Sequence, residues 1–207
     1  TREAGVYNPE GRAMGVTSCD FDDDGDWDIF VANDAMLNYL YRNNGDGTFK
    51  AKQSYTVAGD TAEIELADFN GDGILDVAAI ENSTETVAIL LGNGDGSLGP
   101  KTAYDVTNNP ASMRVADFDN DGDLDVAINQ IGGTAVLLRN DGGNFVDATD
   151  DLAPELKESG LVTSAVWSDA NGDGWVDLTV TVRARGDEGI LVRANARSGA
   201  RPIEDPA

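Results

Sequence analysis

The sequence lacks histidine entirely and contains a single cysteine, Cys19, among its 207 residues. Histidine is the side chain that most often serves as a general base and activates serine or cysteine nucleophiles. The Gly-x-Ser-x-Gly segment that presents a nucleophilic serine is also missing. One cysteine cannot close an internal disulfide, so we expect Cys19 to pack at the end of a strand and not to react. The sequence therefore offers no ordinary catalytic triad or thiol chemistry.

Basic residues and long apolar runs are scarce as well. Lysine and arginine together number 14, against 38 aspartates and glutamates, which gives a net charge of −24. A chain this acidic repels phosphate backbones and anionic lipid surfaces, so we expect no nucleic-acid binding and no direct membrane insertion. No signal peptide or apolar run of membrane length occurs, and we expect any targeting segment to have been removed or to lie outside this sequence.

The most informative feature is an acidic nine-residue loop that recurs at residues 20–28, 68–76, 117–125 and 169–177. Each copy has oxygen-bearing side chains at positions 1, 3, 5 and 9 and glycine at position 6, a pattern that wraps hard ligands around one hard cation. The predicted side-chain ligands are Asp20, Asp22, Asp24 and Asp28; Asp68, Asn70, Asp72 and Asp76; Asp117, Asp119, Asp121 and Asp125; and Asp169, Asn171, Asp173 and Asp177.

Calcium is the predicted ion. Carboxylates packed this closely repel one another, so without a cation the loop would splay or take up protons. Calcium accepts about six to eight oxygens in flexible geometry, whereas magnesium demands a near-ideal octahedron. Backbone carbonyls at position 7, from Asp26, Ile74, Asp123 and Trp175, would add one ligand to each site. Four structural calcium ions would change the net charge from −24 to −16.

The residues after these loops distinguish them from EF-hands. An EF-hand needs a bidentate glutamate at position 12 on an exiting helix, but that position holds Val31, Ala79, Ile128 and Val180. An apolar, β-branched run of strand length comes after each loop instead. Each loop is therefore expected to connect two strands.

The loops begin 48, 49 and 52 residues apart, and each period repeats one order of elements. A short strand precedes the loop, an apolar strand follows it, and a third strand leads through an Asn-Gly or Asp-Gly hairpin turn to a fourth, more polar strand. The predicted fold is all-β, a β-propeller-type array of four-stranded antiparallel blades with a calcium loop between the first two strands of each. The predicted core residues are Val77, Ala79, Leu90, Val126, Ile128, Val136 and Leu138.

We interpret residues 1–207 as one repeat array with repeats at about 14–60, 61–108, 109–160 and 161–207. Residues 1–13 form a lead-in that would complete the last blade or a preceding one. The array is a section of a larger propeller, a closed four-bladed ring, or an open array whose edges pair with other copies. Asp46 and Asp95 in the hairpin turns could be extra metal ligands, although turn chemistry explains them more simply. The fourth repeat is degenerate at this turn.

The loops resemble those of FG-GAP and VCBS repeats, which occur in integrin-α-type β-propellers and in many secreted bacterial proteins. Residues 11–16 and 40–49 are especially similar to proteins related to cartilage acidic protein. The resemblance covers nearly the whole chain, and it implies calcium loops on one face of the propeller with ligands bound at the other. Members of this family serve in adhesion, in carbohydrate or protein recognition, or as scaffolds beside a catalytic module.

We therefore expect a non-enzymatic, calcium-stabilised extracellular recognition or adhesion module. Calcium outside cells is millimolar, which suits weak sites, and metal can replace disulfides as a cross-link. The ligand would be a carbohydrate, a protein or copies of the chain itself. By the family geometry its contacts would lie in residues 7–12, 33–38, 107–110, 129–134 and 183–188, where amides suit sugars and Arg183 and Arg185 suit carboxylates. For any single residue, an ordinary polar turn is the simpler interpretation.

Two other functions stay open. The chain could be a subunit of an extracellular filament or ring formed by pairing of blade edges. It could also be the scaffold part of a polysaccharide-acting enzyme, with spare acids such as Glu63, Glu81, Glu85 and Asp187 forming a carboxylate pair. Asn82 begins the sequence's only Asn-x-Ser/Thr motif, in a turn between two expected strands, and is a candidate glycosylation site.

Overall fold

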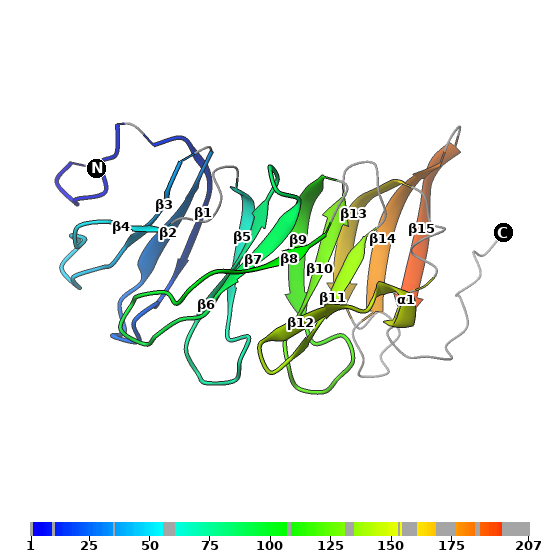
Figure 1. Ribbon diagram of the computed structural model, residues 1–207. Helices are drawn as coiled ribbons and strands as arrows, with labels where there is room; N and C mark the ends of the chain where they lie inside the picture. Colours follow the sequence, from blue (N-terminus) through cyan, green and yellow to red (C-terminus); the bar gives the residue numbers. More distant parts are fainter. Residues whose placement is uncertain are drawn as a thin grey trace. The chain divides into compact units, whose positions relative to one another are not determined.

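The computed structural model describes residues 2–9, 11–34, 36–55, 61–106, 109–130, 135–152, 154, 161–168, 177–184 and 187–195; for residue 62 and for residues 161–195 it describes the backbone alone. The chain divides into two compact units, Thr1–Asp105 and Val106–Ala207. Each unit contains two antiparallel sheets (Figure 1).

The first unit contains two four-stranded sheets, each a meander in which consecutive strands pair. Their orders are β1-β2-β3-β4 and β5-β6-β7-β8. The strands are β1 Ala13–Cys19, β2 Asp28–Asn33, β3 Asn38–Tyr41, β4 Gln53–Tyr55, β5 Thr61–Ala67, β6 Asp76–Glu81, β7 Thr86–Leu90 and β8 Thr102–Asp105. Each acidic loop joins the first two strands of its sheet, as the sequence predicts.

The second unit repeats this arrangement. Its sheets have the orders β12-β11-β10-β9 and β13-β14-β15. The strands are β9 Pro110–Ala116, β10 Asp125–Gln130, β11 Val136–Asp141, β12 Asn144–Asp147, β13 Leu161–Ser168, β14 Asp177–Ala184 and β15 Asp187–Asn195, with one short helix, α1 Thr149–Leu152. Among the described residues, three four-stranded sheets are thus present, and the fold is all-β apart from one helical turn.

The core of the first unit lies between its two sheets. Phe21, Phe30 and Leu40 of the first repeat pack against the second sheet, on a face that includes Val77 and Leu90. Strand β6 is buried at every residue, because apolar side chains on both of its faces have neighbours to pack against. Cys19 is partly buried against this core, in agreement with the packing role expected for it.

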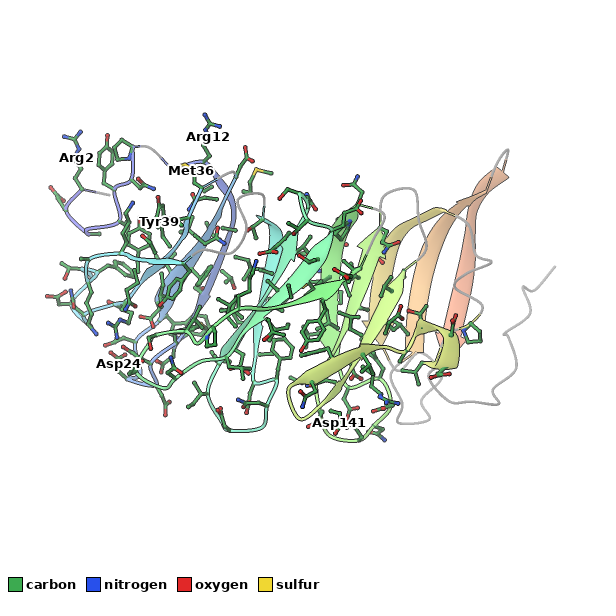
Figure 2. The ribbon with its side chains drawn as sticks, in the orientation of Figure 1. Arg2, Arg12, Asp24, Met36, Tyr39 and Asp141 are labelled. Atoms are coloured by element: carbon green, nitrogen blue, oxygen red, sulfur yellow. The ribbon has the colours of Figure 1, made fainter. Side chains whose placement is uncertain are left out.

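The ends of the second strands carry buried polar residues. The strands begin with Asp28, Asp76 and Asp125 and end with Asn33, Glu81 and Gln130, all of them buried. The loop end and the opposite end of the first sheet are visible in Figure 2, where Asp24 lies at the loop end and Arg12 and Met36 at the other. Polar side chains therefore fix both ends of each apolar strand.

The fourth sheet has three strands among the described residues, and the fourth strand expected in this repeat falls on residues 196–207, which lie outside them. Two details differ from the sequence-based expectations. Val136 is only half-buried, and Ala135 and Leu137 are buried beside it, whereas the other predicted core residues are buried. Helix α1 was not predicted; Asp147 Oδ1 starts it by accepting hydrogen bonds from the Thr149 N–H and hydroxyl, at 3.0 and 2.6 Å. In the part of the chain that the structure describes, no helix combines the length and apolarity needed to cross a membrane.

Candidate metal centre

Each described loop makes a tight turn because two of its residues have left-handed backbone. Glycine at position 6 has a φ between 83° and 101°, which only glycine adopts at no steric cost. Position 4 is also left-handed, and there the chain uses glycine, aspartate or asparagine, the residues that tolerate this conformation. The residues at position 4 are Asp23 (φ 55°), Gly71 (φ 74°) and Asn120 (φ 61°).

The aspartate at position 9 ties the end of the loop to its start and to the third strand. Its carboxylate is buried, and its Oδ2 atom accepts a hydrogen bond from the backbone N–H of position 2. These donors are Phe21, Phe69 and Phe118, at 3.0, 2.9 and 2.8 Å. Its Oδ1 atom accepts from an N–H just beyond the third strand or at its end. These donors are Asn43, Gly92 and Asn140, at 2.8, 2.7 and 2.7 Å. Carboxylate oxygens have further lone pairs, so each can also accept a cation as an additional partner.

Positions 1 and 5 shape the loop interior through backbone hydrogen bonds. In the first loop, Asp20 accepts from the N–H groups of Asp24 and Gly25, at 3.1 and 2.8 Å. Asp24 in turn accepts from the N–H of Asp26 at 3.0 Å. The second and third loops repeat both contacts in part: Asp68 accepts from Gly73, Asp117 from Gly122, Asp72 from Ile74 and Asp121 from Asp123. The loop conformation is thus set by the chain's own aspartates.

The structure brings positions 1, 3 and 9 together. In the first and third loops, one carboxylate oxygen from each of these positions lies within 4.8 Å of the others. The two clusters are Asp20, Asp22 and Asp28, and Asp117, Asp119 and Asp125. Asp24 and Asp121, the predicted ligands at position 5, lie outside these clusters. Three of the predicted side-chain ligands therefore converge in each of these two loops.

Several oxygens in these clusters are buried without a hydrogen-bond donor. Among the described residues, Asp22 Oδ1, Asp117 Oδ1 and Asp119 Oδ1 have no hydrogen-bond partner. A buried acceptor that is left unsatisfied costs free energy, and natural proteins rarely leave one without a partner, a water or an ion. The donor set therefore fits a hard cation that takes oxygen ligands.

The pKa values of the buried loop carboxyls are raised. Burial raises the pKa of Asp125 to about 6, and the charges of Asp119 and Asp121 add to the rise while backbone hydrogen bonds oppose it. Burial, with smaller contributions from neighbouring aspartates, also raises the pKa values of Asp28 and Asp76. An ionised cluster is thus unfavourable without added positive charge.

The second loop is less acidic at position 3. Asn70 accepts a hydrogen bond from the Asp72 N–H through Oδ1 and donates one to Asp72 Oδ2 through Nδ2, both at 3.0 Å. The fourth loop lies outside the described residues except for the backbone of Asp177. The ligand roles of residues 169, 171, 173, 175 and 177, and of the position-7 carbonyls in every loop, stay predictions.

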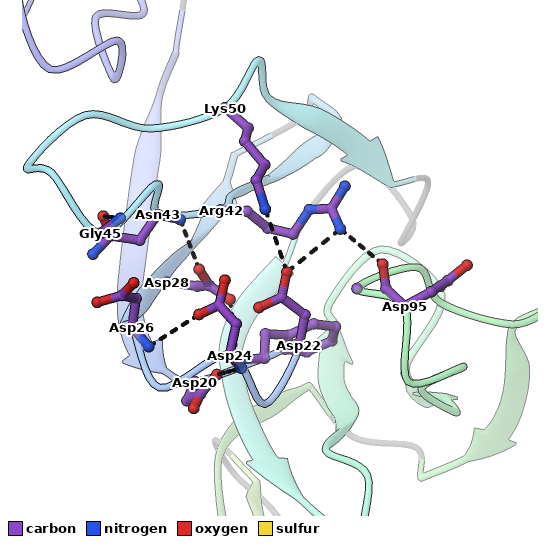
Figure 3. Close-up of polar contacts among 12 residues, drawn as sticks. Asp20, Asp22, Asp24, Asp26, Asp28, Arg42, Asn43, Gly45, Lys50 and Asp95 are labelled. Atoms are coloured by element: carbon purple, nitrogen blue, oxygen red, sulfur yellow. Dashed lines mark hydrogen bonds and ion pairs between the residues drawn. The ribbon is translucent and has the colours of Figure 1, made fainter.

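Two basic residues that the sequence analysis did not consider lie beside the first loop (Figure 3). Asp22 Oδ2 is 3.5 Å from Arg42 Nη1 and 3.6 Å from Lys50 Nζ. Arg42 Nη1 also donates a 2.7 Å hydrogen bond to the Asp95 carbonyl of the next repeat. Asp22 thus presents one oxygen to the basic groups and keeps its other oxygen buried, with no hydrogen-bond partner among the described residues.

Asp46 and Asp95 have a turn-forming role. Asp46 Oδ1 accepts hydrogen bonds from the Thr48 N–H and hydroxyl, and Asp95 Oδ1 does the same with Ser97. These side-chain hydrogen bonds lower the pKa values of both carboxyls. The hairpin interpretation therefore accounts for both residues.

Five segments were expected to contact a carbohydrate or protein. The first two of them, residues 7–12 and 33–38, meet at a cavity of about 270 Å³. It is lined by Asn8 and Gly11 from one segment, Asn33 from the other, and apolar residues of β1 and β2 such as Val16 and Val31. Residues 107–108, 131–134 and 185–186 lie outside the described residues. Asn33 also has a structural role, because its amide donates to the Leu37 carbonyl at 2.9 Å while its Oδ1 is buried without a partner in the described part of the chain.

The spare acids and the glycosylation motif are partly accounted for. Glu81 is buried and binds Lys101 at 2.9 Å and the Thr86 hydroxyl at 2.8 Å, so it holds the β6–β7 turn together. Asn82 lies in that turn, and the hydroxyl of Thr84, the third residue of the motif, hydrogen bonds to Glu81 and Thr86. Neither enzymatic activity nor glycosylation is tested by these contacts.

The family model for an FG-GAP-like repeat matches residues 20–79, 68–128 and 117–180. Each match begins at the first aspartate of an acidic loop, and together the matches cover well over half of the sequence. The chain therefore belongs to the FG-GAP-like repeat family, as its loops indicated. No curated protein matches the chain.

Two solved structures show a related fold. One, an Agrocybe aegerita lectin described for specific recognition of non-reducing terminal N-acetylglucosamine, has a TM-score of 0.53 and 21% identity over 86% of this chain and 51% of the lectin. The other, BBS1N in complex with ARL6DN, has a TM-score of 0.58 and 14% identity over 99% of this chain and 60% of its own. The chain thus spans half to three-fifths of these proteins. At such identities the likeness shows the fold alone, which is β-propeller-like.

Proposed function

We propose that the chain is a non-enzymatic, extracellular recognition module whose acidic loops bind about four structural calcium ions. The side chains at positions 1, 3, 5 and 9 and the carbonyl at position 7 of each loop would hold the ions. Calcium would supply the positive charge that allows neighbouring carboxylates to stay ionised together. The aspartates at positions 1, 5 and 9 fix the loop backbone, so the site is organised by the chain's own hydrogen bonds.

The observation that carries this proposal is the set of buried, unpaired oxygens. Asp22 Oδ1 in the first loop and Asp117 Oδ1 and Asp119 Oδ1 in the third are buried with no described donor. They belong to the clusters in which positions 1, 3 and 9 converge. An oxygen-only, carboxylate-rich donor set favours calcium over zinc or copper, which prefer nitrogen and sulfur ligands.

An extracellular location follows from the same chemistry. Extracellular calcium is millimolar and fills weak, surface-exposed loops, whereas cytosolic calcium would leave them largely empty. The −24 net charge requires abundant counterions in any case. Secretion would therefore place the chain where its loops are loaded.

Recognition of a carbohydrate or protein is supported by a cavity on the first sheet that reaches the end opposite the acidic loop. This cavity, lined by Asn8, Gly11 and Asn33 at that end, has no charged residue in its described lining, although the chain is strongly acidic. Amides beside apolar walls suit a neutral, hydroxyl-bearing group. One structural neighbour is a lectin and another binds a protein partner, in keeping with either ligand class.

A thermal melt in calcium and in excess chelator tests the calcium part of the proposal. Calcium should raise the melting temperature strongly, because ions bound only to the folded state stabilise it by mass action. A glycan array with the calcium-loaded protein tests recognition, with Asn8→Ala as the variant expected to lose binding. Asn44→Ala, which removes an exposed amide at the loop end, is the matched control. An identical melt in calcium and chelator would count against the calcium sites.

Assembly with further repeats is a second candidate, favoured by the outer face of the first sheet. Register makes Val16, Ile29 and Val31 equivalent to Ile64, Val77 and Ala79 of the second sheet. In the second sheet these positions pack on the first sheet, whereas Val16 is 67% exposed. The apolar face therefore suits another FG-GAP-like sheet.

This second candidate is tested by light scattering of the calcium-loaded protein over a range of concentrations. Association should increase with concentration and should be weakened by Val16→Lys. Thr102→Lys, at an exposed position of β8, is the control. A protein that stays monomeric throughout, with Val16→Lys indistinguishable from the parent, would exclude self-assembly through this face.

A further inference from the structure

Arg42 is held in a fixed position beside the first acidic loop. Its Nη1 atom donates to the Asp95 carbonyl at 2.7 Å and lies 3.5 Å from Asp22 Oδ2. The side chain passes against Gly96, where an added Cβ would lie 2.7 Å from Nη1. Figure 3 shows the guanidinium between Asp22 and Asp95. The same nitrogen thus contacts both the Asp95 carbonyl and Asp22, which holds the positive charge beside the loop.

The same strand position carries a matching residue in each repeat. Tyr41, Leu90 and Leu138 pair with the residue after position 9, so the residues that follow them, Arg42, Leu91 and Arg139, are equivalent. Arginine occurs where position 3 of the loop is aspartate, as Asp22 and Asp119, and leucine occurs where position 3 is Asn70. By strand register, Arg139 occupies in the third repeat the position that Arg42 occupies in the first.

The fourth repeat follows the same pattern at the Arg42 position, whereas the neighbouring lysine occurs in the first repeat but not at the equivalent positions of the second and third. The backbone register of β14 and β15 makes Asn195 equivalent to Arg42, and the sequence has Asn171 at position 3 of that loop. Lys50, the second basic group beside Asp22, is equivalent to Gly99 in the second repeat, since their N–H groups bond to the carbonyls of Arg42 and Leu91, and to Val146 in the third, which pairs with Arg139. At the Arg42 position, an arginine thus accompanies an acidic position 3, and a neutral residue accompanies an amide.

We infer that Arg42 is a built-in counterion of Asp22 that stabilises the calcium-free first loop and lowers its calcium affinity, with Arg139 acting likewise in the third loop. This inference rests on the proposed calcium function. Asp22 Oδ2 faces Arg42 and Lys50, which leaves the buried Oδ1 for an ion. A fixed positive charge near that ion repels it, but it also offsets carboxylate repulsion when the ion is absent. The repeats therefore hold calcium with graded affinity.

The first loop can be observed by itself because Trp27 occupies its position 8. The chain has three tryptophans, so Trp167→Phe with Trp175→Phe leaves Trp27 alone to sensitise terbium luminescence, and Trp27 is 66% exposed. Calcium competition against terbium in this background measures calcium affinity at the first loop. The variants are Arg42→Gln, Arg42→Lys, which keeps the charge, and Lys50→Gln; Arg12→Gln removes a charge at the opposite end of the sheet.

Arg42→Gln should tighten calcium binding about three- to tenfold and lower the melting temperature in chelator. Lys50→Gln should do the same more weakly, which guards against a folding defect caused by losing the Asp95 contact. Arg42→Lys and Arg12→Gln should match the parent. If the parent gives a normal terbium signal but Arg42→Gln and Lys50→Gln both leave the calcium affinity unchanged, the counterion inference is wrong. The proposed calcium function would still stand in that case. Absence of terbium and calcium binding in the parent would remove the proposed calcium function itself.

Discussion

At the residue scale, the buried aspartate at position 9 connects the sequence pattern to the fold. Asp28, Asp76 and Asp125 each use both carboxylate oxygens to hold two backbone N–H groups, one from the loop and one from the end of the third strand. The sequence identified these residues as ligands but contained no sign of this second role, because a hydrogen bond across about 15 residues leaves no local pattern. Position 9 therefore has a structural role in addition to its proposed role as a metal ligand.

Replacing Asp76 by alanine should destabilise the protein even in chelator. The change leaves the N–H groups of Phe69 and Gly92 without their acceptor, and we expect a loss of about 2–3 kcal/mol in the free energy of unfolding. Urea unfolding of the calcium-free protein measures it. Asp105→Ala, an exposed carboxylate on β8, is the control and should change little. Equal stability of the two variants would show that position 9 has no structural role.

The raised pKa of Asp125 predicts an unusual pH dependence for the calcium-free protein. The folded-state pKa of about 6 exceeds the ordinary value of 3.8, so the folded state binds this proton more tightly than the unfolded chain. The stabilisation is present below pH 3.8 and is lost as the pH rises through about 6. Melts in chelator should therefore fall across this window, and Asp125→Asn should flatten the fall. In calcium the trend should reverse, because the ion needs ionised carboxylates.

At the scale of the element, the strand–loop–strand order of each repeat follows from local residue patterns that can be recognised in the sequence. Glycine at position 6 and glycine, asparagine or aspartate at position 4 allow the left-handed backbone that reverses the chain between two strands. The position and order of the strands could therefore be predicted from the sequence. Helix α1 could not, since it depends on a four-residue capping arrangement around Asp147 and Thr149.

Comparing Gly71→Asn with Gly71→Val should distinguish the cost of the left-handed backbone from the cost of a steric clash. Gly71 has a φ of 74° and no atom within 4 Å of an added Cβ, so both side chains fit. Asparagine adopts this backbone at the same position of the third loop, at Asn120, and should be nearly neutral. Valine should cost about 1–2 kcal/mol because a β-branched residue is strained there. Thermal melts of both variants in calcium make the comparison, and equal losses would contradict the backbone argument.

At the scale of the whole molecule, the main feature is how acidic and basic side chains from distant segments are brought together. The pattern of four loops indicated oxygen ligands, and the structure gathers positions 1, 3 and 9 in the first and third loops. The sequence did not predict that Arg42 and Lys50 are the counterions of Asp22. Both residues lie after strand β3, further along the chain than the loop they contact. Pairing of charges between distant segments depends on strand register, which a hydrophobic pattern does not specify to the residue.

Sodium chloride should partly substitute for calcium in stabilising the folded protein. With 38 acidic and 14 basic residues, the calcium-free chain repels itself, and sodium chloride screens that repulsion. We expect added salt to raise the melting temperature more in chelator than in calcium, where bound ions already offset the charge. Sucrose, a neutral stabiliser, is the control and should raise both melts alike. A larger salt effect on the calcium-loaded form would contradict this view.

An anomalous difference map from crystals grown in calcium tests the central claim most directly. The account predicts a peak in each of the three described loops, contacted by the side chains at positions 1, 3, 5 and 9. In the first loop, Asp22 Oδ1 should face the ion and Asp22 Oδ2 should still face Arg42. Ordered loops without such peaks, at calcium concentrations typical of the extracellular space, would contradict it.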